Sequence, residues 1–244
     1  MLLHIQAVLF DMFDTLMLVE RHKDYSSPSL QRMYKFLSGH GVEVSFETFE
    51  SAYNRSREEL YAKADPNLEE PHFHTRIAQT LFILGYAASP ESSLVAAASA
   101  EFCDEFMKYV TLDADLVIIL SHLRERYKLG IVSNFAIPNC VARLLDREGL
   151  TNIFDTVIVS GAINKRKPAP EIFRQALDKL GVAPEEAVFV GDTLDADVLG
   201  AKAAGMRSVY VARRVEKEVS ATPDIIIKSL SELPAVLEKW QAEN

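Results

Sequence analysis

The chain has 244 residues, of which 48% are hydrophobic and 25% are charged, as in a globular protein large enough for one core and a smaller inserted unit. No apolar run approaches the roughly 18 residues that a membrane-spanning helix needs. The formal net charge of -9 argues against a nucleic-acid or anionic-membrane partner, since both require a basic surface. An anionic substrate would therefore need local positive charge from a metal ion or a few placed lysines and arginines.

The start of the chain lacks the basic segment of a secretory signal, and we therefore expect a cytoplasmic protein. Residues 1–6 lead directly into the apolar segment 7–10, which ends in an acid. This short aliphatic segment predicts the first strand of a sheet.

Residues 18–110 contain several helix patterns and no convincing strand. Ser27 and Pro28 open a helix that ends near Gly41, and Ser45 caps a second helix. A third helix pattern ends at residue 85, and residues 89–90 open a fourth. These signals predict an all-helical cap domain at 18–110, inserted after the first strand, with hinges at residues 17–20 and 110–113.

The C-terminal half alternates short apolar runs with helix-period segments, the rhythm of a parallel sheet with βαβ connections. The runs are continuous rather than alternating, which indicates helices on both faces. The expected fold is therefore α/β, a doubly wound, Rossmann-like core formed by residues 1–17 and 111–244. Its later strands are predicted at 128–133, 156–160, 187–190, 208–211 and 224–227, and its helices at 138–148, 168–180, 194–204 and 231–241.

Polar residues follow four of these strands. Asp11 follows the first strand, Ser133 and Asn134 end the second, Lys167 follows the third, and Asp192 and Asp197 follow the fourth. In an open parallel sheet, ligands bind outside the carboxyl ends of the strands. Taken singly, a serine can cap a turn, a lysine can belong to a solvated charge run, and an aspartate can start a helix. Together they predict an active site at one edge of the sheet.

These four segments resemble the four motifs of the haloacid dehalogenase-like (HAD) hydrolase superfamily. The resemblance covers residues 5–18 and 116–211 and is especially close from Lys167 to Phe173 and on through Met206. The helical segment resembles the cap that one branch of the superfamily carries between its first and second motifs. The resemblance therefore implies a hydrolase that uses an aspartate nucleophile and acts on a small anionic substrate.

The resemblance also implies a role for each motif residue. Asp11 would be the nucleophile and would form a covalent aspartyl intermediate, which divides one difficult displacement into two easier ones. Thr15, Ser133 and Asn134 would bind the substrate. Lys167 would contact it too and would offset charge among the acids and on the intermediate.

The expected cofactor is Mg²⁺. By the same resemblance, Asp192 would bind the ion together with Asp11 and the backbone carbonyl of Phe13. Asp197 would bind it directly or hold its water molecules, in keeping with the preference of Mg²⁺ for a few carboxylates and several waters.

Phe13 departs from the phosphatase pattern. Phosphatases of this superfamily carry a second aspartate two residues after the nucleophile, where it protonates the leaving group and then activates water. General acid–base catalysis is worth about 10²- to 10⁴-fold. The leading hypothesis is therefore a Mg²⁺-dependent phosphatase of a small phosphorylated metabolite, with activity that depends strongly on the leaving group.

Three alternatives remain at this stage. An aromatic residue at position 13 and Asn134 resemble the 2-haloacid dehalogenase branch, but those enzymes lack the acid that Asp192 supplies. They also use a cap arginine, for which the candidates are Arg32, Arg55 and Arg57. Phosphonate hydrolases of the superfamily use a cap lysine, for which Lys35 and Lys63 are candidates. The third alternative is a non-catalytic relative that binds a phosphorylated ligand or a protein.

Two other groups of residues do not indicate a site. Cys103 and Cys140 are too few for a disulfide framework and are expected as buried free thiols. His72 and His74 have the spacing of a metal pair, but no further ligand pattern accompanies them, and we expect cap histidines in contact with solvent. The sequence gives no indication of the oligomeric state.

Overall fold

The computed structural model describes residues 4–20, 24–113, 115–213 and 221–242. Its main sheet has six parallel strands in the order β5-β4-β1-β6-β7-β8. The chain reaches one side of β1 first and then returns to the other side, so the strand order reverses between β1 and β6. This confirms the doubly wound α/β prediction. The strands are β1 (Ala7–Phe10), β4 (Lys128–Ser133), β5 (Thr156–Val159), β6 (Ala187–Gly191), β7 (Arg207–Val211) and β8 (Ile225–Ile227).

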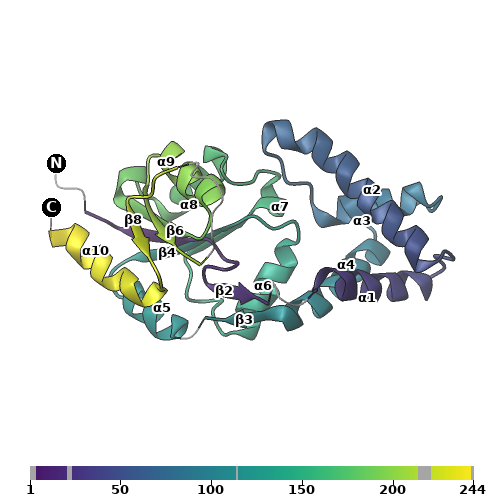
Figure 1. Ribbon diagram of the computed structural model, residues 1–244, viewed down its shortest axis with the longest axis horizontal. Helices are drawn as coiled ribbons and strands as arrows, with labels where there is room; N and C mark the ends of the chain where they lie inside the picture. Colours follow the sequence, from purple (N-terminus) through teal and green to yellow (C-terminus); the bar gives the residue numbers. More distant parts are fainter. Residues whose placement is uncertain (1–3, 21–23, 114, 214–220, 243–244) are drawn as a thin grey trace.

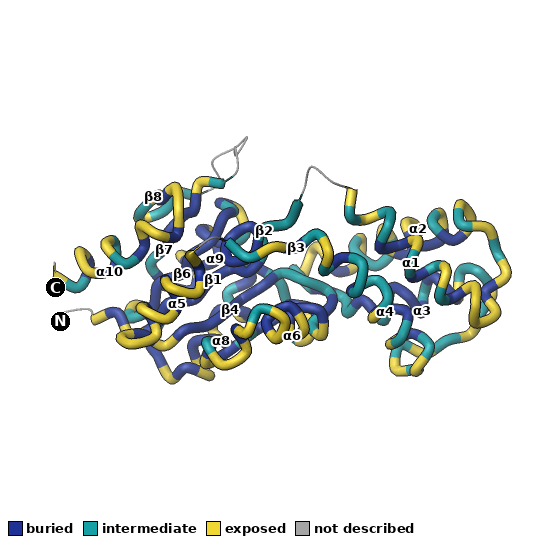
Figure 2. The backbone as a smooth tube through the Cα atoms, turned by 90° about the horizontal axis from the view of Figure 1, so that it is seen from below, coloured by how far each residue is buried: buried dark blue, intermediate teal, exposed yellow. Residues whose placement is uncertain are grey.

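Helices cover both faces of the sheet, which explains why the apolar residues of its strands run continuously and do not alternate with polar ones. Val8 and Phe10 of β1 share a core with α5 (Leu116–Arg124), α6 (Pro138–Arg147) and α10 (Leu233–Ala242). Ala7 and Leu9 point to the opposite face, where α8 (Pro170–Leu180) and α9 (Leu199–Ala203) pack. Figure 2 shows the buried strands between these helices.

Four further helices form a group at the end of the molecule away from α10 (Figure 1). They are α1 (Ser26–Ser38), α2 (Phe46–Ala64), α3 (Phe73–Ile83) and α4 (Ser93–Phe106), and we refer to them as the cap helices. α1 packs against α4, and α2 packs against α3. Short turns η1 (Asp65–Asn67) and η2 (Met107–Tyr109) follow α2 and α4.

The prediction of no strand in residues 18–110 was wrong at both ends. β2 (Met17–Val19) and β3 (Val110–Leu112) pair antiparallel and form a two-stranded sheet where the chain enters and leaves the cap helices. Each strand has only three residues, too few for a period of two to be visible in the sequence. Their pairing joins the two segments that were predicted as hinges.

Several predicted boundaries shift by a few residues. The third core strand ends at Val159, and Ser160 begins α7 (Ser160–Ile163). α8 begins at Pro170 rather than Pro168, because the backbone of Lys167 is held in a loop by the side chain of Asn134. The helix predicted from residue 194 is a π-helical turn, η4 (Leu194–Val198), followed by α9. The turns η3 (Pro184–Glu186) and η5 (Leu230–Glu232) precede β6 and α10.

The structure also bears on the predictions for the cysteines and for membrane-spanning helices. Cys103 and Cys140 are buried free thiols, as predicted. In the described part of the chain, no helix combines the length and the apolar character that crossing a membrane requires.

Candidate active site

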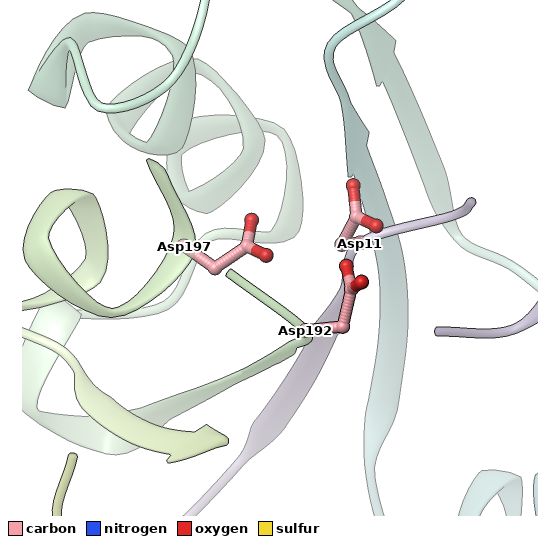
Figure 3. Close-up of side chains that lie close together, drawn as sticks. All are labelled: Asp11, Asp192 and Asp197. Atoms are coloured by element: carbon pink, nitrogen blue, oxygen red, sulfur yellow. The ribbon is translucent and has the colours of Figure 1, made fainter. Parts of the chain in front are cut away.

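Three aspartates meet at the carboxyl ends of β1 and β6, where the strand order reverses (Figure 3). The backbone N–H of Asp11 donates to the carbonyl of Val190 at 2.9 Å, which places Asp11 beside the end of β6 and therefore beside Asp192. One carboxylate oxygen from each of Asp11, Asp192 and Asp197 lies within 4.8 Å of the other two, and all three residues are buried. The structure thus brings together the acids that the sequence predicted.

Lys167 lies among these acids. Its ammonium Nζ is 2.5 Å from Asp11 Oδ1 and 2.7 Å from Asp197 Oδ1, and the residue is only 3% exposed. The same atom lies 5.2 Å from the ring centroid of Phe189. A lysine this deeply buried requires paired carboxylates, because an isolated ammonium would be strongly destabilised by the loss of water. Lys167 is therefore part of the site and is no solvated member of a charge run.

Asn134 fixes the position of this lysine. Its Oδ1 accepts from the backbone N–H of Lys167 at 2.7 Å, and its Nδ2 donates to the Lys167 carbonyl at 3.0 Å. The side-chain amide therefore bonds the backbone of a loop 33 residues further along the chain. Asn134 was predicted to bind substrate, and that stays a prediction; its observed contacts position the Lys167 loop.

A π-helical turn presents Asp197. Its Oδ2 accepts hydrogen bonds from the backbone N–H and the hydroxyl of Thr193, at 3.0 and 2.8 Å. Gly191 lies directly below, where an added Cβ would be only 2.4 Å from the Asp197 carboxylate carbon. Only glycine therefore leaves room for this carboxylate to face Lys167.

The charge balance of the site is negative. Three carboxylates and one ammonium leave a net charge of -2 when all are ionised. Burial raises the pKa of Asp11 to about 6, even though the ammonium of Lys167 acts in the opposite direction. Carboxylate oxygens are the preferred ligands of hard divalent cations. The donor set fits such an ion, and the site can bind a metal.

Two buried hydroxyls flank the acids. Thr15 and Ser133 are fully buried, and in the described chain their hydroxyl groups have no hydrogen-bond partner. A buried hydroxyl without a partner costs about 1–3 kcal/mol, so its persistence is expected where a ligand completes the bond. Neighbouring Asp14 has a different role, because its Oδ1 accepts from the backbone N–H of Val19 at 3.1 Å and braces the loop.

Phe13 belongs to an aromatic cluster. Its ring centroid lies 4.8 Å from that of Phe135 and 5.7 Å from that of Phe106, and the last two rings stack at 5.3 Å. Phe106 belongs to the cap helix α4, whereas Phe13 and Phe135 follow core strands. Phe13 occupies the position where phosphatases of the superfamily carry their second aspartate. In this protein that position therefore forms an apolar contact between core and cap.

A cavity of about 580 Å³ lies between the core loops and the cap helices. Phe13, Asn134 and Phe135 line it from the core side. Tyr53 and Arg76 are among the residues that line it from the cap. Its volume is in the range of small-molecule sites, and its lining combines aromatic surface with a few polar groups.

The predicted cap candidates mostly lie elsewhere. Arg32 pairs with Glu101 and Asp104 of α4, and Arg55 is exposed and pairs with Glu59. Lys35 and Lys63 are exposed and do not line the cavity. Of these five candidates, only Arg57 lines it. The ring centroids of His72 and His74 lie 4.4 Å apart, and both residues are partly exposed.

Sequence reasoning missed Arg76, Tyr53 and Tyr61. Arg76 lies on the buried face of α3, between Phe73 and Ile77. A charged residue at the i+3 position of an otherwise apolar helix stripe is the signal that marks it in the sequence.

The model of the haloacid dehalogenase-like hydrolase family matches residues 5–205. The chain belongs to this family. It is 35% identical over 210 residues to glyceraldehyde 3-phosphate phosphatase of Methanopyrus kandleri, a match that covers 86% of this chain and 84% of that protein. The four motifs read from the sequence therefore identified the family correctly, and the protein is a hydrolase of the HAD type.

Two solved structures show the same architecture. The 2-haloacid dehalogenase from Pseudomonas syringae pv. Tomato has a TM-score of 0.71 and 24% identity, with 97% of this chain and 99% of that chain covered. A HAD phosphatase from Thermococcus onnurineus has a TM-score of 0.60 and 27% identity, with 96% and 98% covered. The fold is thus common to dehalogenases and phosphatases, and the site must decide between the two reactions.

Proposed function

We propose that this protein is a Mg²⁺-dependent phosphatase of a small phosphorylated metabolite, with Asp11 as the nucleophile. The observation that carries the proposal is the buried contact of Lys167 with both Asp11 and Asp197, next to Asp192. A divalent cation would be held by these three aspartates, with the predicted help of the Phe13 carbonyl, because carboxylates are its preferred ligands. The dehalogenase branch lacks the acid that Asp192 supplies, so this acid favours the metal-dependent reaction.

The reaction follows from the groups in place. The carboxylate of Asp11 attacks phosphorus, the bond from phosphorus to the ester oxygen breaks, and an aspartyl phosphate forms. The Thr15 and Ser133 hydroxyls donate to the phosphoryl oxygens, and Lys167 stabilises the negative charge. When bound, Mg²⁺ neutralises charge on the phosphoryl group. Water then attacks phosphorus, which releases inorganic phosphate and restores Asp11.

Phe13 limits which leaving groups can depart quickly. Its side chain supplies no proton, so the departing oxygen takes one from water. Aryl and acyl phosphates leave without that help, whereas alkyl phosphates depend on it. We therefore expect faster turnover of activated phosphates than of alkyl phosphates.

The relative from Methanopyrus kandleri is named for glyceraldehyde 3-phosphate, and this three-carbon phosphate is a candidate substrate here. The cavity volume accommodates a molecule of that size. A small anionic partner and a cytoplasmic location stay predictions from the sequence.

The test is phosphate release by purified protein from an aryl phosphate, acetyl phosphate and glyceraldehyde 3-phosphate, with Mg²⁺ and with a chelator. We expect Mg²⁺-dependent release that is fastest for the activated compounds and is abolished in Asp11→Asn. The matched control is Asp146→Asn on the outer face of α6. No release from any compound, or equal release with the chelator, would contradict the proposal.

A second candidate reaction, 2-haloacid dehalogenation, is favoured by one observation, the aromatic wall that Phe13 forms with Phe106 and Phe135. Halide ion leaves without a proton, so Phe13 would not limit it. Halide release from a short 2-haloacid in the presence of a chelator would support this reaction over the phosphatase.

A further inference from the structure

The side chain of Arg213 reaches the loop of residues 12–17, which we call the active-site loop, from a strand that carries none of the predicted site residues. Arg213 lies two residues beyond the end of β7, at the same edge of the sheet as Asp11 and Asp192. Parallel strands present their carboxyl ends to one edge, so a residue in this place lies near the site. The side chain of Arg213 is mostly buried, with 20% of it exposed.

The guanidinium connects the segment after β3 to the active-site loop. Its Nη2 pairs with the carboxylate of Asp113, which directly follows β3, and the same nitrogen lies 3.5 Å from the backbone carbonyl oxygen of Thr15. The side chain of Asp113 is also mostly buried, with 16% of it exposed. The backbone N–H of Asp113 donates to the carbonyl of Leu16 at 3.3 Å. Arg213 and Asp113 therefore lie together against the backbone of the loop.

The active-site loop carries the buried hydroxyl of Thr15, which the proposed reaction uses to hold the phosphoryl group. The N–H groups of Leu16 and Met17 both donate to the carbonyl of Met12 at 2.9 Å, so the loop is a tight turn. Met17 begins β2, which pairs with β3, and Figure 1 shows this pair between the main sheet and the cap helices. Because the carbonyl and the side chain of Thr15 meet at neighbouring atoms of one residue, a contact that fixes the carbonyl also restricts where the hydroxyl points.

A buried ion pair of this kind contributes little to stability. Desolvation of the two charges offsets most of their attraction, and apolar residues of similar size often stabilise a fold as well. The pair is also incompletely satisfied, because the Nε–H of Arg213 is buried without an acceptor in the described part of the chain. What the guanidinium adds is a fixed geometry, since it donates its hydrogen bonds in one plane. The pair with Asp113 is therefore suited to holding the active-site loop in one position against β3.

We propose that Arg213 is a positioning residue that, together with Asp113, fixes the active-site loop so that the Thr15 hydroxyl can donate to the transferred phosphoryl group. This inference rests on the proposed phosphatase function for the identity of the ligand at Thr15. It adds the end of a fifth strand, β7, to the four strand ends that carry the predicted residues. It also connects the loop to the place where the chain leaves the cap helices, because Asp113 directly follows β3.

A double-mutant cycle tests whether Arg213 acts through Thr15. We measure kcat/KM for an aryl phosphate with Mg²⁺ in the wild type, in Thr15→Val, in Arg213→Met and in the double variant. In the wild-type background, Thr15→Val should lower kcat/KM by about 10- to 100-fold, the effect of losing a hydrogen bond to a charged group. With Arg213→Met, the same substitution should cost no more than about threefold, because the hydroxyl is already misplaced. The control Arg174→Met, on the exposed face of α8, should leave the full effect of Thr15→Val.

A variant without either charge separates positioning from folding. Asp113→Leu combined with Arg213→Met leaves no unpaired buried charge, so chemical denaturation should show a stability close to that of the wild type. Thr15→Val should still cost no more than about threefold in this charge-free variant. Hydrogen exchange followed by NMR reports on the loop without any substrate. The N–H groups of Leu16 and Met17 should exchange about 10-fold faster in the charge-free variant, whereas those of β6 should keep their rates.

Two results would each overturn the inference. One is additivity, in which Thr15→Val lowers kcat/KM by the same factor with and without Arg213. The other is unchanged exchange of the Leu16 and Met17 N–H groups in the charge-free variant. Failure of the proposed function gives a different result: the wild type would release no phosphate from the aryl phosphate, while faster exchange in the charge-free variant would still show that Arg213 and Asp113 position the loop.

Discussion

Phe13 and Asp11 stand two residues apart and have opposite environments. Asp11 contacts the ammonium of Lys167 at 2.5 Å, whereas the Phe13 ring packs on Phe106 and Phe135. The proposed nucleophile is therefore buried next to a cation, and the residue two positions later is a ring that forms an apolar contact with the cap. Asp14 does not substitute for it, because its carboxylate braces the backbone of Val19.

Replacing this ring with the missing acid tests the consequence. Phe13→Asp should raise kcat for an alkyl phosphate by about 10²-fold or more, since general acid catalysis is worth 10²- to 10⁴-fold. The rate for an aryl phosphate should change much less, because its leaving group needs no proton. The measurement is kcat for both substrates, with Phe13→Asn as the control of similar size without an acid. A protein that only binds its ligand would show no gain with either substrate.

Single elements determine how the acids and the lysine are presented. The π-helical turn η4 brings Asp197 to face Lys167, and Gly191 at the end of β6 leaves the space that its carboxylate occupies. The loop that carries Lys167 is bonded to Asn134 at the end of β4. Asp197 and Lys167 are thus each positioned by a local backbone segment, and each segment contacts a residue of another element.

Gly191→Ala tests whether the space beside Asp197 is needed for the turn η4 to keep its position. The added Cβ would be 2.4 Å from the Asp197 carboxylate carbon, so the turn must shift. We expect a loss of stability of about 1–3 kcal/mol, the usual cost of overpacking, together with weaker Mg²⁺ binding. Gly39→Ala is the control, because its Cβ would meet the nearest backbone oxygen at an ordinary 3.4 Å. Chemical denaturation and a metal titration measure both effects; equal stability of the two variants would show that η4 accommodates the methyl group.

At the scale of the whole molecule, the loop that carries Lys167 also contacts the turn after the cap helix α2. The Arg166 N–H donates to the Leu68 carbonyl at 2.9 Å, and its Nη1 donates to the Glu69 carbonyl at 3.0 Å. Its Nη2 pairs with Asp65 at 2.5 Å. Arg166, the residue before Lys167, therefore connects the loop at the buried aspartates to the turn that follows α2.

Arg166→Met tests this connection. It removes an ion pair and a hydrogen bond that together are worth about 1 kcal/mol, because the pair is partly exposed. We expect KM to rise several-fold, and kcat to change less, since Arg166 forms no ion pair with Asp11, Asp192 or Asp197. Lys63→Met, an exposed substitution on α2, is the control. Steady-state kinetics with an aryl phosphate measure both constants, and an unchanged KM would mean that the cap is held by its apolar contacts alone.

The sequence by itself determined the parallel sheet, its helices and the strand ends that carry Asp11, Ser133, Lys167 and Asp192. These features are local: continuous apolar runs, proline and glycine at helix ends, and polar residues directly after strands fix them without knowledge of distant contacts. The family followed from the same short motifs.

Only the tertiary structure decided the contacts between distant segments. Asn134 bonds a loop 33 residues away, β2 and β3 pair across the cap insertion, and Arg76 faces a cavity shared with the core. Such contacts depend on which helix face turns inward and on how two domains meet, and no short sequence window contains that information. For this reason the proposed nucleophile Asp11 was predictable, whereas the cap residues that line the cavity were not.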